Sequence, residues 1–294
     1  MRKLQSEALL ILTAAIWGLA FVAQRKGMQY LDPLLFNGIR FALGAIIIGM
    51  FVDKAKVRSA GSPFPWLLGI VLFIAASLQQ IGIVYTSAGN AGFITGLYIV
   101  FVPLLGIFRK QRLSKLIMVS ILLSVSGLYL INVRQPVTAS LGNLLVLVSA
   151  VFWALHVQLI DKYTQNNDTF TLATGQFSIC AVLSVAAGIV WHLAKSPSYL
   201  LSQTLFNNIG TASLTILYGG LFSVGIAYTL QVHAQKHVPP APATIILCLE
   251  GVFALLGGWL ILKETLSAYI LMGAALLLTA MLLSVSAAFR RYQT

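Results

Sequence analysis

Long apolar runs, separated by short polar segments that carry most of the charges, make up nearly all of this chain of 294 residues. Most runs approach the roughly 20 residues that a helix needs to cross the hydrocarbon core of a bilayer. They are continuous instead of alternating with a period of two, which favours membrane helices over barrel strands. We therefore predict an all-α integral membrane protein with ten transmembrane helices, at residues 6–24, 33–52, 64–85, 89–107, 114–132, 140–160, 169–192, 210–232, 241–262 and 266–287.

The composition supports this interpretation, because 59% of the residues are hydrophobic, only 9% are charged, and the mean hydropathy is +0.90. A soluble domain carries charges on roughly a quarter of its residues. The net charge of +12 does not indicate a nucleic-acid partner, because the basic residues lie between the apolar runs instead of forming one patch. Cys180 and Cys248 both fall inside predicted spans, where we expect them to pack as apolar residues.

Lysine and arginine indicate the orientation. With the N-terminus inside, thirteen of them fall on the cytoplasmic side and five on the outer side, with Arg40 left inside a span. The positive-inside rule then places both termini in the cytoplasm. We expect a multi-pass protein of the inner membrane whose first span is retained, since no convincing signal-peptide cleavage site follows it.

The second half of the chain repeats the first. The matching pairs are Ala14–Leu19 with Ala150–Leu155 and Asp32 with Asp168 at an offset of 136 residues, then Lys110–Ser114 with Lys263–Ser267 at an offset of 153. The 17 additional residues of the second half belong to the outer loop at 193–210, which we expect at the membrane surface.

Each repeat, 1–134 and 135–294, contains five predicted spans. Because five is odd, the two repeats enter the membrane in opposite orientations. Inverted repeats of this kind are common in secondary transporters, which place the substrate site between them.

The chain resembles the EamA family of the drug/metabolite transporter superfamily. The motifs that carry this resemblance are Ala14–Gly18 with Ala150–Ala154, Thr86–Tyr98, Val102–Leu104, and Leu249–Phe253 followed by Lys263-Glu264. The resemblance implies a small-molecule exporter in which four helices of each repeat surround a central cavity, with the fifth and tenth helices outside. The family usually has proline after the acid of its ninth span. Gly251 stands there in this chain, which leaves open whether that helix bends.

Glu250 is the strongest candidate for chemistry, because it lies about 14 Å along its span and therefore near mid-bilayer. Three interpretations stay open. It binds a proton or a cationic substrate group, in surroundings that favour the neutral carboxyl. It pairs with Arg40 as a structural lock. Alternatively, it makes only a hydrogen bond to a neighbouring helix.

Arg40 lies about 10 Å from the outer end of the second span. An arginine at that depth normally faces a cavity or a partner instead of lipid. A substrate carboxylate and the side chain of Glu250 are both suitable partners, and the sequence does not separate them.

Trp17 and Trp153 occupy equivalent positions in the two repeats, too deep for interfacial anchors. They line the cavity or pack the repeat interface, and we favour the cavity. His156 shares a helical face with Trp153, where a packing role is favoured over a role as ligand. Further candidate substrate-binding residues are Gln79, Tyr85, Tyr98 and Gln176.

The sequence argues against an enzyme. His156 and Asp161 have the HxxxxD spacing of some acyltransferases, but on a helix five residues separate the side chains by about 140°. The sequence contains no phosphate loop, no metal-spaced His/Cys cluster and no GxSxG motif, so we predict no cofactor.

We predict a secondary transporter that moves a small metabolite, amino acid or drug by alternating access, as a monomer or a homodimer. Proton coupling stays open. The alternatives are a membrane enzyme acting on a lipid-linked substrate and a non-transporting scaffold.

Overall fold

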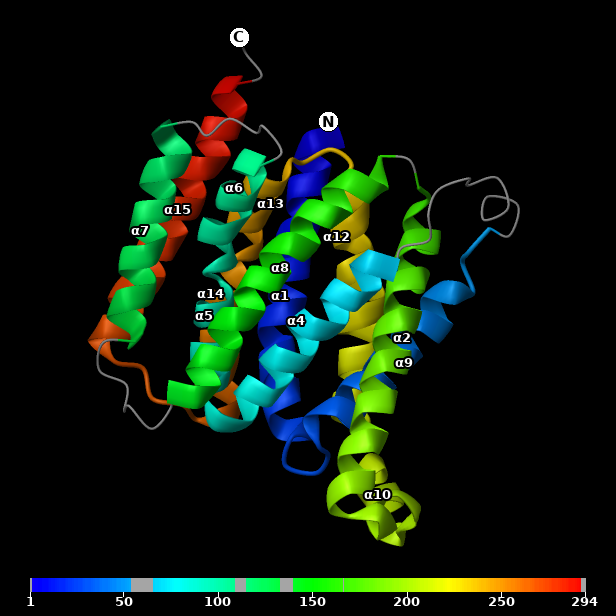
Figure 1. The fold of residues 1–294 in the computed structure, drawn as a ribbon. Coiled ribbons are helices and arrows are strands. Elements are labelled where there is room, and N and C mark those ends of the chain that lie inside the picture. Colours follow the sequence, from blue (N-terminus) through cyan, green and yellow to red (C-terminus); the bar gives the residue numbers. More distant parts are fainter. Residues whose placement is uncertain (1, 54–65, 109–114, 133–139, 166, 292–294) are drawn as a thin grey trace.

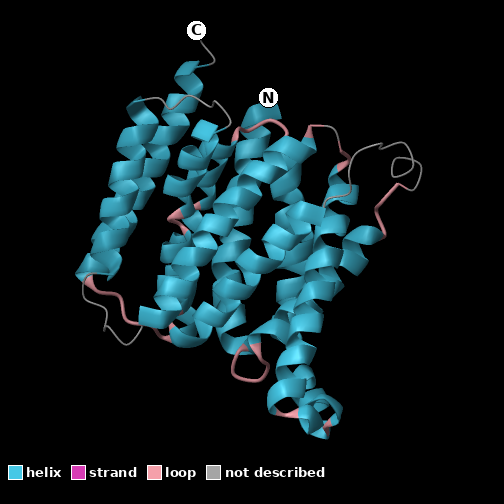
Figure 2. Cartoon of the chain, viewed as in Figure 1, coloured by secondary structure: helices cyan, strands magenta, loops and turns pink. Residues whose placement is uncertain are grey.

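The computed structural model of this chain is a bundle of helices (Figures 1 and 2). It describes residues 2–53, 66–108, 115–132, 140–165 and 167–291. No strand occurs within those ranges. The start of α1 and the end of α15 lie at the same end of the bundle (Figure 1). In the orientation predicted above this is the cytoplasmic side, so we call it the inner end and the opposite side the outer end.

The helices follow the predicted spans in order. The first repeat contains α1 (Arg2–Gly27), α2 (Pro33–Gly49), α4 (Trp66–Tyr85), α5 (Ala88–Thr95), α6 (Tyr98–Phe108) and α7 (Lys115–Asn132). The second repeat contains α8 (Ser140–Thr164), α9 (Thr169–Lys195), η2 (Pro197–Leu201), α10 (Gln203–Thr211), α11 (Ser213–Leu217), η3 (Tyr218–Tyr228), α12 (Thr229–Ala234), α13 (Pro240–Leu247), α14 (Leu249–Leu262) and α15 (Ala268–Arg291).

Seven segments of the described chain are long and apolar enough to cross a membrane, which confirms a multi-pass helical membrane protein. Shorter apolar helices cover the other three predicted spans, at 33–49, 118–127 and 268–280. Every predicted span thus overlaps a helix, while the count of ten complete crossings stays a prediction.

The repeated aspartates cap equivalent helices. The Asp32 carboxylate accepts hydrogen bonds from the backbone N–H groups of Leu34 and Leu35 at the start of α2, at 3.0 Å each. Asp168 does the same for Phe170 and Thr171 at the start of α9. Both caps satisfy N–H groups that have no partner within the helix. The repetition seen in the sequence therefore has a structural cause at this position.

The helices divide into a core and a flanking pair. The last helix of each repeat, α7 and α15, lie side by side at one edge of the bundle (Figure 1). Among the remaining helices, α1 lies against α14 and against η3, while α2 packs on α9 and α4 packs on α8. This is the arrangement that the family resemblance implies.

Two spans are interrupted near their middle. The fourth span is divided into α5 and α6 at Gly96 and Leu97, and the ninth into α13 and α14 at Cys248. The two interruptions meet, because the Cys248 thiol donates to the carbonyl of Gly96 at 3.2 Å. Gly251 lies beyond the interruption, where a side chain would come 2.9 Å from the ring of Phe93. Close packing therefore explains the glycine at this position.

The eighth span contains an 11-residue π-helix, η3, which was not predicted. π-helical turns are rare and frequently occur at functional sites. Gly220 lets this helix approach α2, since an added Cβ would come 2.6 Å from the side chain of Leu43. The wide helix thus lies directly against the helix that carries Arg40.

The second half's additional residues form η2 and α10, which project at the outer end (Figure 1). Leu205 of α10 packs with Leu31 and Phe36 of the first repeat. The placement of this segment at the membrane surface stays a prediction.

The contact between α1 and α14 generates a test of the fold. A Cβ on Gly18 would lie 2.6 Å from the carbonyl oxygen of Glu250, so Gly18→Ala must separate the two helices. We expect a loss of about 1–3 kcal/mol in the free energy of unfolding, seen as a lower unfolding temperature in detergent. Gly210→Ala is the matched control, because no atom lies within 4 Å of its added Cβ. Equal unfolding temperatures for the two variants would contradict the contact.

Candidate functional site

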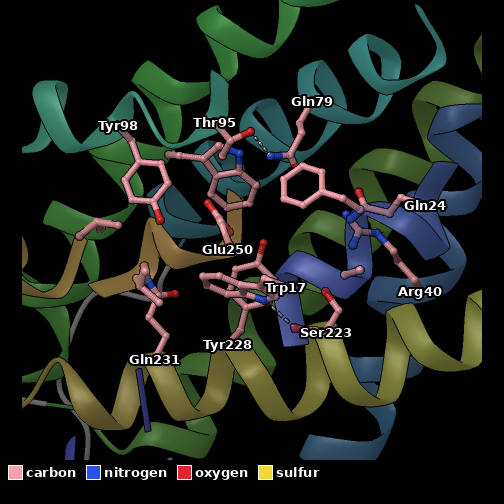
Figure 3. Close-up of a pocket in the computed structure, with 15 residues that line it drawn as sticks. Trp17, Gln24, Arg40, Gln79, Thr95, Tyr98, Ser223, Tyr228, Gln231 and Glu250 are labelled. Atoms are coloured by element: carbon pink, nitrogen blue, oxygen red, sulfur yellow. Dashed lines mark hydrogen bonds between the residues drawn. The ribbon is translucent and has the colours of Figure 1, made fainter. Parts of the chain in front are cut away.

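The centre of the bundle holds a narrow cavity between the two repeats (Figure 3). Its volume is about 40 Å³, room for a few water molecules. Its polar lining comes from both halves of the chain. These polar and aromatic residues are Trp17, Phe21, Gln24, Arg40, Gln79, Thr95, Tyr98, Trp153, Ser223, Tyr228, Gln231 and Glu250.

Aromatic rings form the middle of the cavity wall. The ring of Tyr228 lies 4.6 Å from that of Trp17 and 6.0 Å from that of Trp153, measured between centroids. The indole Nε1 of Trp17 donates to the backbone carbonyl of Ser223 in η3 at 3.0 Å. The two tryptophans that the repeat made equivalent thus lie on either side of one tyrosine and both line the cavity. Their contact with substrate stays a prediction.

One end of the cavity is acidic. Glu250 is 4% exposed and sits in the first turn of α14, just after the interruption of its span. The Tyr98 hydroxyl and the Glu250 carboxyl point toward one another (Figure 3). Apart from this mutual approach, neither the Tyr98 hydroxyl nor Oε1 of Glu250 has a hydrogen-bond partner among the described residues. Other buried polar atoms of the described chain also lack partners, but these two face a cavity where a ligand can supply the bond.

The other end is basic. Arg40 is 2% exposed, its Nε donates to Oδ1 of Asn37 at 2.8 Å, and its guanidinium carbon lies 4.8 Å from the centroid of the Phe41 ring. No acidic side chain of the described chain lies within 4.0 Å of it. Gln24 lies on the same side of the cavity (Figure 3), and its Oε1 has no partner there. A buried cation without a counter-ion is costly, and an anionic group in the cavity would remove that cost.

Arg40 and Glu250 do not form an ion pair in this conformation, since within the described chain neither has a side chain of opposite charge within 4.0 Å. The structure therefore does not support the structural-lock interpretation of Glu250. The two charged groups face one cavity from separate positions.

Sequence reasoning missed several polar lining residues. Gln24 lies seven residues after Trp17, two turns along the same face of α1, so helical spacing could have indicated it. Gln231 lies one turn after Tyr228 for the same reason, and its Oε1 has no partner among the described residues. Thr95 accepts a hydrogen bond from Nε2 of Gln79 at 2.9 Å, which explains how the predicted Gln79 is held.

Three predicted site residues do not line the cavity. Tyr85 is 55% exposed at the end of α4, so its predicted substrate contact has no support in this structure. His156 and Gln176 are fully buried and bonded to each other, with 2.7 Å between His156 Nε2 and Gln176 Oε1. They pack behind the aromatic wall, edge-on to Trp153 and Tyr228.

This His–Gln pair shows how the two repeats differ. At the offset of 136 residues His156 corresponds to Ala20, and Gln176 corresponds to Arg40. In the second repeat the side chains of His156 and Gln176 bond to each other and do not border the cavity. In the first repeat the small Ala20 leaves space, and Arg40 borders the cavity. The polar site is therefore one-sided, although the fold around it is repeated.

Comparison with protein families agrees with this arrangement. The model of the EamA-like transporter family matches residues 5–133 and 140–286, which covers nearly the whole chain in two units. The chain belongs to the EamA-like transporter family.

Individual EamA-like relatives match along nearly their full length. An uncharacterized transporter of Archaeoglobus fulgidus is 28% identical over 96% of this chain and 86% of its own. A probable amino-acid metabolite efflux pump of Escherichia coli is 24% identical over 94% of this chain and 93% of its own. One solved crystal structure superposes with a TM-score of 0.76 over 99% of both chains at 18% identity, which supports the fold alone.

The EamA-like assignment and the names of these relatives point to a membrane transporter and not to an enzyme. A transporter of this kind acts on a small molecule in a membrane environment. The described residues contain no group of three or more His, Cys, Asp or Glu side chains that could hold a metal ion.

A double-mutant cycle tests the separation of the two charges. Because Arg40 and Glu250 make no ion pair, we expect the stability changes of Arg40→Gln and Glu250→Gln to add within about 0.5 kcal/mol in the double variant. Asp32 and His192 provide the paired control, with 3.0 Å between carboxylate oxygen and imidazole nitrogen. Asp32→Asn and His192→Gln should therefore show coupling. A coupling of about 2 kcal/mol or more between Arg40 and Glu250 would contradict the geometry.

Proposed function

We propose that this protein exports a small, partly apolar metabolite that carries both an acidic and a basic group, such as an amino acid or a close derivative. Arg40 binds the carboxylate, Glu250 binds the ammonium group, and the aromatic wall between them contacts the apolar part. The single observation that carries this proposal is the presence of one uncompensated cation and one uncompensated carboxyl at separate positions in one cavity.

Desolvation of the two charged side chains explains why such a substrate would bind. Placing either charge in the membrane interior is costly unless a partner is supplied. A zwitterion supplies both partners at once, with its own charges separated as the site requires. A relative named as a probable amino-acid metabolite efflux pump supports the same substrate class.

The narrowness of the cavity supports alternating access. Ligand pockets usually measure roughly 300–1,000 Å³, whereas this cavity measures about 40 Å³. A substrate therefore enters only after the surrounding helices move. The two interrupted spans, which meet at Gly96 and Cys248, provide helix halves that can move separately.

Glu250 is also our candidate for proton coupling. A buried carboxyl favours its neutral form, so it can hold a proton when no cationic group is bound. Exchange of that proton for the substrate ammonium group would couple export to the proton gradient. The positive-inside distribution supports an inner-membrane location with both termini in the cytoplasm.

Transport in liposomes tests the substrate class. Purified protein would be given an apolar amino acid, the amine that lacks its carboxylate and the acid that lacks its ammonium group, each radiolabelled. We expect the complete zwitterion to move fastest. Arg40→Gln should slow it by about tenfold or more, because a truncated buried charge pair costs several kcal/mol. Tyr85→Phe is the control and should transport like the wild type, since Tyr85 lies outside the cavity. Equal transport of the zwitterion by wild type and Arg40→Gln would contradict the proposal.

A pH-sensitive dye trapped in the same liposomes tests coupling. We expect substrate-dependent proton movement in the wild type and none in Glu250→Gln, because an amide cannot carry the proton. Substrate movement without proton movement in both proteins would show a facilitator. Proton movement that persists in Glu250→Gln would place the proton site elsewhere.

A further inference from the structure

The hairpin between α4 and α5, at the outer end of the bundle, is held by two charged side chains from distant parts of the chain. Arg25, at the end of α1, donates from one guanidinium nitrogen to the carbonyls of Ile83 and Val84 at 2.6 and 2.7 Å. Glu264, in the loop between α14 and α15, accepts from the backbone N–H groups of Ala88 and Gly89 at 3.1 and 3.3 Å. We call these four contacts the outer clamp.

The outer clamp matches the charges of the two helix ends. The last carbonyls of α4 and the first N–H groups of α5 have no partners within their helices and carry partial negative and positive charge. The Arg25 guanidinium binds these carbonyls, and the Glu264 carboxylate binds these N–H groups. Charge-assisted hydrogen bonds of this kind are roughly twice as strong as neutral ones, so the clamp resists separation of the hairpin from α1 and α14.

Local backbone geometry holds Glu264 in place. Its own N–H donates to the carbonyl of Gly258 at 3.0 Å, after Lys263 has reversed the chain with φ at 60°. The Glu264 carboxylate lies against Gly258, where an added Cβ would collide with it. Gly89 similarly leaves the carboxylate room on α5.

The clamp residues are not repeated in the sequence of the other half of the chain. At the offset of 136 residues Arg25 corresponds to Asp161, and an ionised carboxylate cannot donate to carbonyls. At the offset of 153 residues Glu264 corresponds to the uncharged Gln111, and Gly89 corresponds to Pro242, which has no N–H. The fold is repeated, but the counterparts of the clamp residues have different side-chain chemistry.

The packing of the helices also differs between the outer and the inner end of the bundle. At the outer end α4 and α8 touch through their backbones, since a Cβ on Gly142 would come 2.8 Å from the carbonyl oxygen of Gly82. The counterpart of Gly142 at the inner end is Ser6, which together with His233 and His237 borders a hollow between α1 and α12. At this pair of positions the helices are in backbone contact at the outer end, whereas the described residues at the inner end border a hollow.

We propose that Arg25 and Glu264 form the lock of the outer gate, and that their four hydrogen bonds bias the resting transporter toward the outward-closed state. Opening to the outside requires the hairpin to leave both charged groups. In an exporter this bias keeps the site available to cytoplasmic substrate until binding drives the opening. This inference rests on the proposed transport function and on the predicted orientation.

Labelling of a cavity cysteine tests the lock without any transport assay. Gln24→Cys places a thiol in the cavity, and both native cysteines are buried, so protein without this change measures the background. A membrane-impermeant maleimide is added outside intact cells. We expect slow labelling of Gln24→Cys alone, and about tenfold faster labelling when Glu264→Gln or Arg25→Gln is added, since each loses charge-assisted hydrogen bonds.

The neighbouring basic residues supply matched controls. Lys26→Gln and Lys263→Gln remove an exposed charge beside each clamp residue, and they should leave the labelling rate unchanged. Fast labelling without either clamp substitution, or equal rates in the clamp and control variants, would overturn the proposal. Monodisperse elution of each variant on gel filtration separates opening of the gate from loss of the fold.

The side of the membrane on which each end of the bundle lies is measured in the same cells. Lys195→Cys at the end of α9 should be labelled from outside, and Lys162→Cys in α8 only after the cells are permeabilised. The reverse pattern would invert the orientation and overturn the lock as an outer gate. If transport of the tested compounds fails while clamp-dependent labelling is seen, the substrate class is wrong and the lock stands.

Discussion

Desolvation in the membrane interior is the constraint on which the rest of this structure depends. A hydrocarbon core offers no water to polar groups, so each must find a partner in the protein or face a cavity. Asp32 and Asp168 meet this demand by capping helices, and His156 Nε2 and Gln176 Oε1 meet it by bonding to each other. Arg40 and Glu250 face the central cavity instead, without a counter-ion from the described chain. The position of the cavity and the chemistry of its two ends follow from this difference.

Duplication explains the frame of the molecule, and departures from duplication explain its site. Equivalent helices pack in equivalent ways, with Trp17 and Trp153 on either side of Tyr228. The proposed substrate needs two halves that differ, because a symmetric site would bind two identical groups. Ala20 and Arg40 in one half, against His156 and Gln176 in the other, place the basic group on one side of the cavity only. The clamp residues Arg25 and Glu264 are likewise not repeated in the sequence, since Asp161 and Gln111 stand at the equivalent positions.

Interrupted helices connect the site to the helix movements that transport requires. The breaks at Gly96 and Cys248 lie beside Tyr98 and Glu250, so the groups that face the cavity sit where the backbone departs from regular α-helix. The π-helix η3 adds a third irregular element, held to α1 by Trp17 and by the Tyr218 hydroxyl, which donates to the carbonyl of Ile16 at 3.0 Å. Irregular backbone at membrane depth is tolerated where it borders a cavity or is buried in protein.

The sequence by itself determined the helical membrane fold, the duplication and the two intramembrane charges. Apolar runs of membrane length and the cost of a charge in lipid are local properties, visible at Arg40 and Glu250 without any partner. Only the tertiary structure decided that these two groups do not pair, that Tyr85 lies outside the cavity, and that Gln24 and Gln231 border it. The clamp contacts and both helix interruptions were equally hidden. Each depends on how helices distant in sequence approach one another, and that approach is set by the packing of small residues such as Gly18 and Gly92 against a particular neighbour.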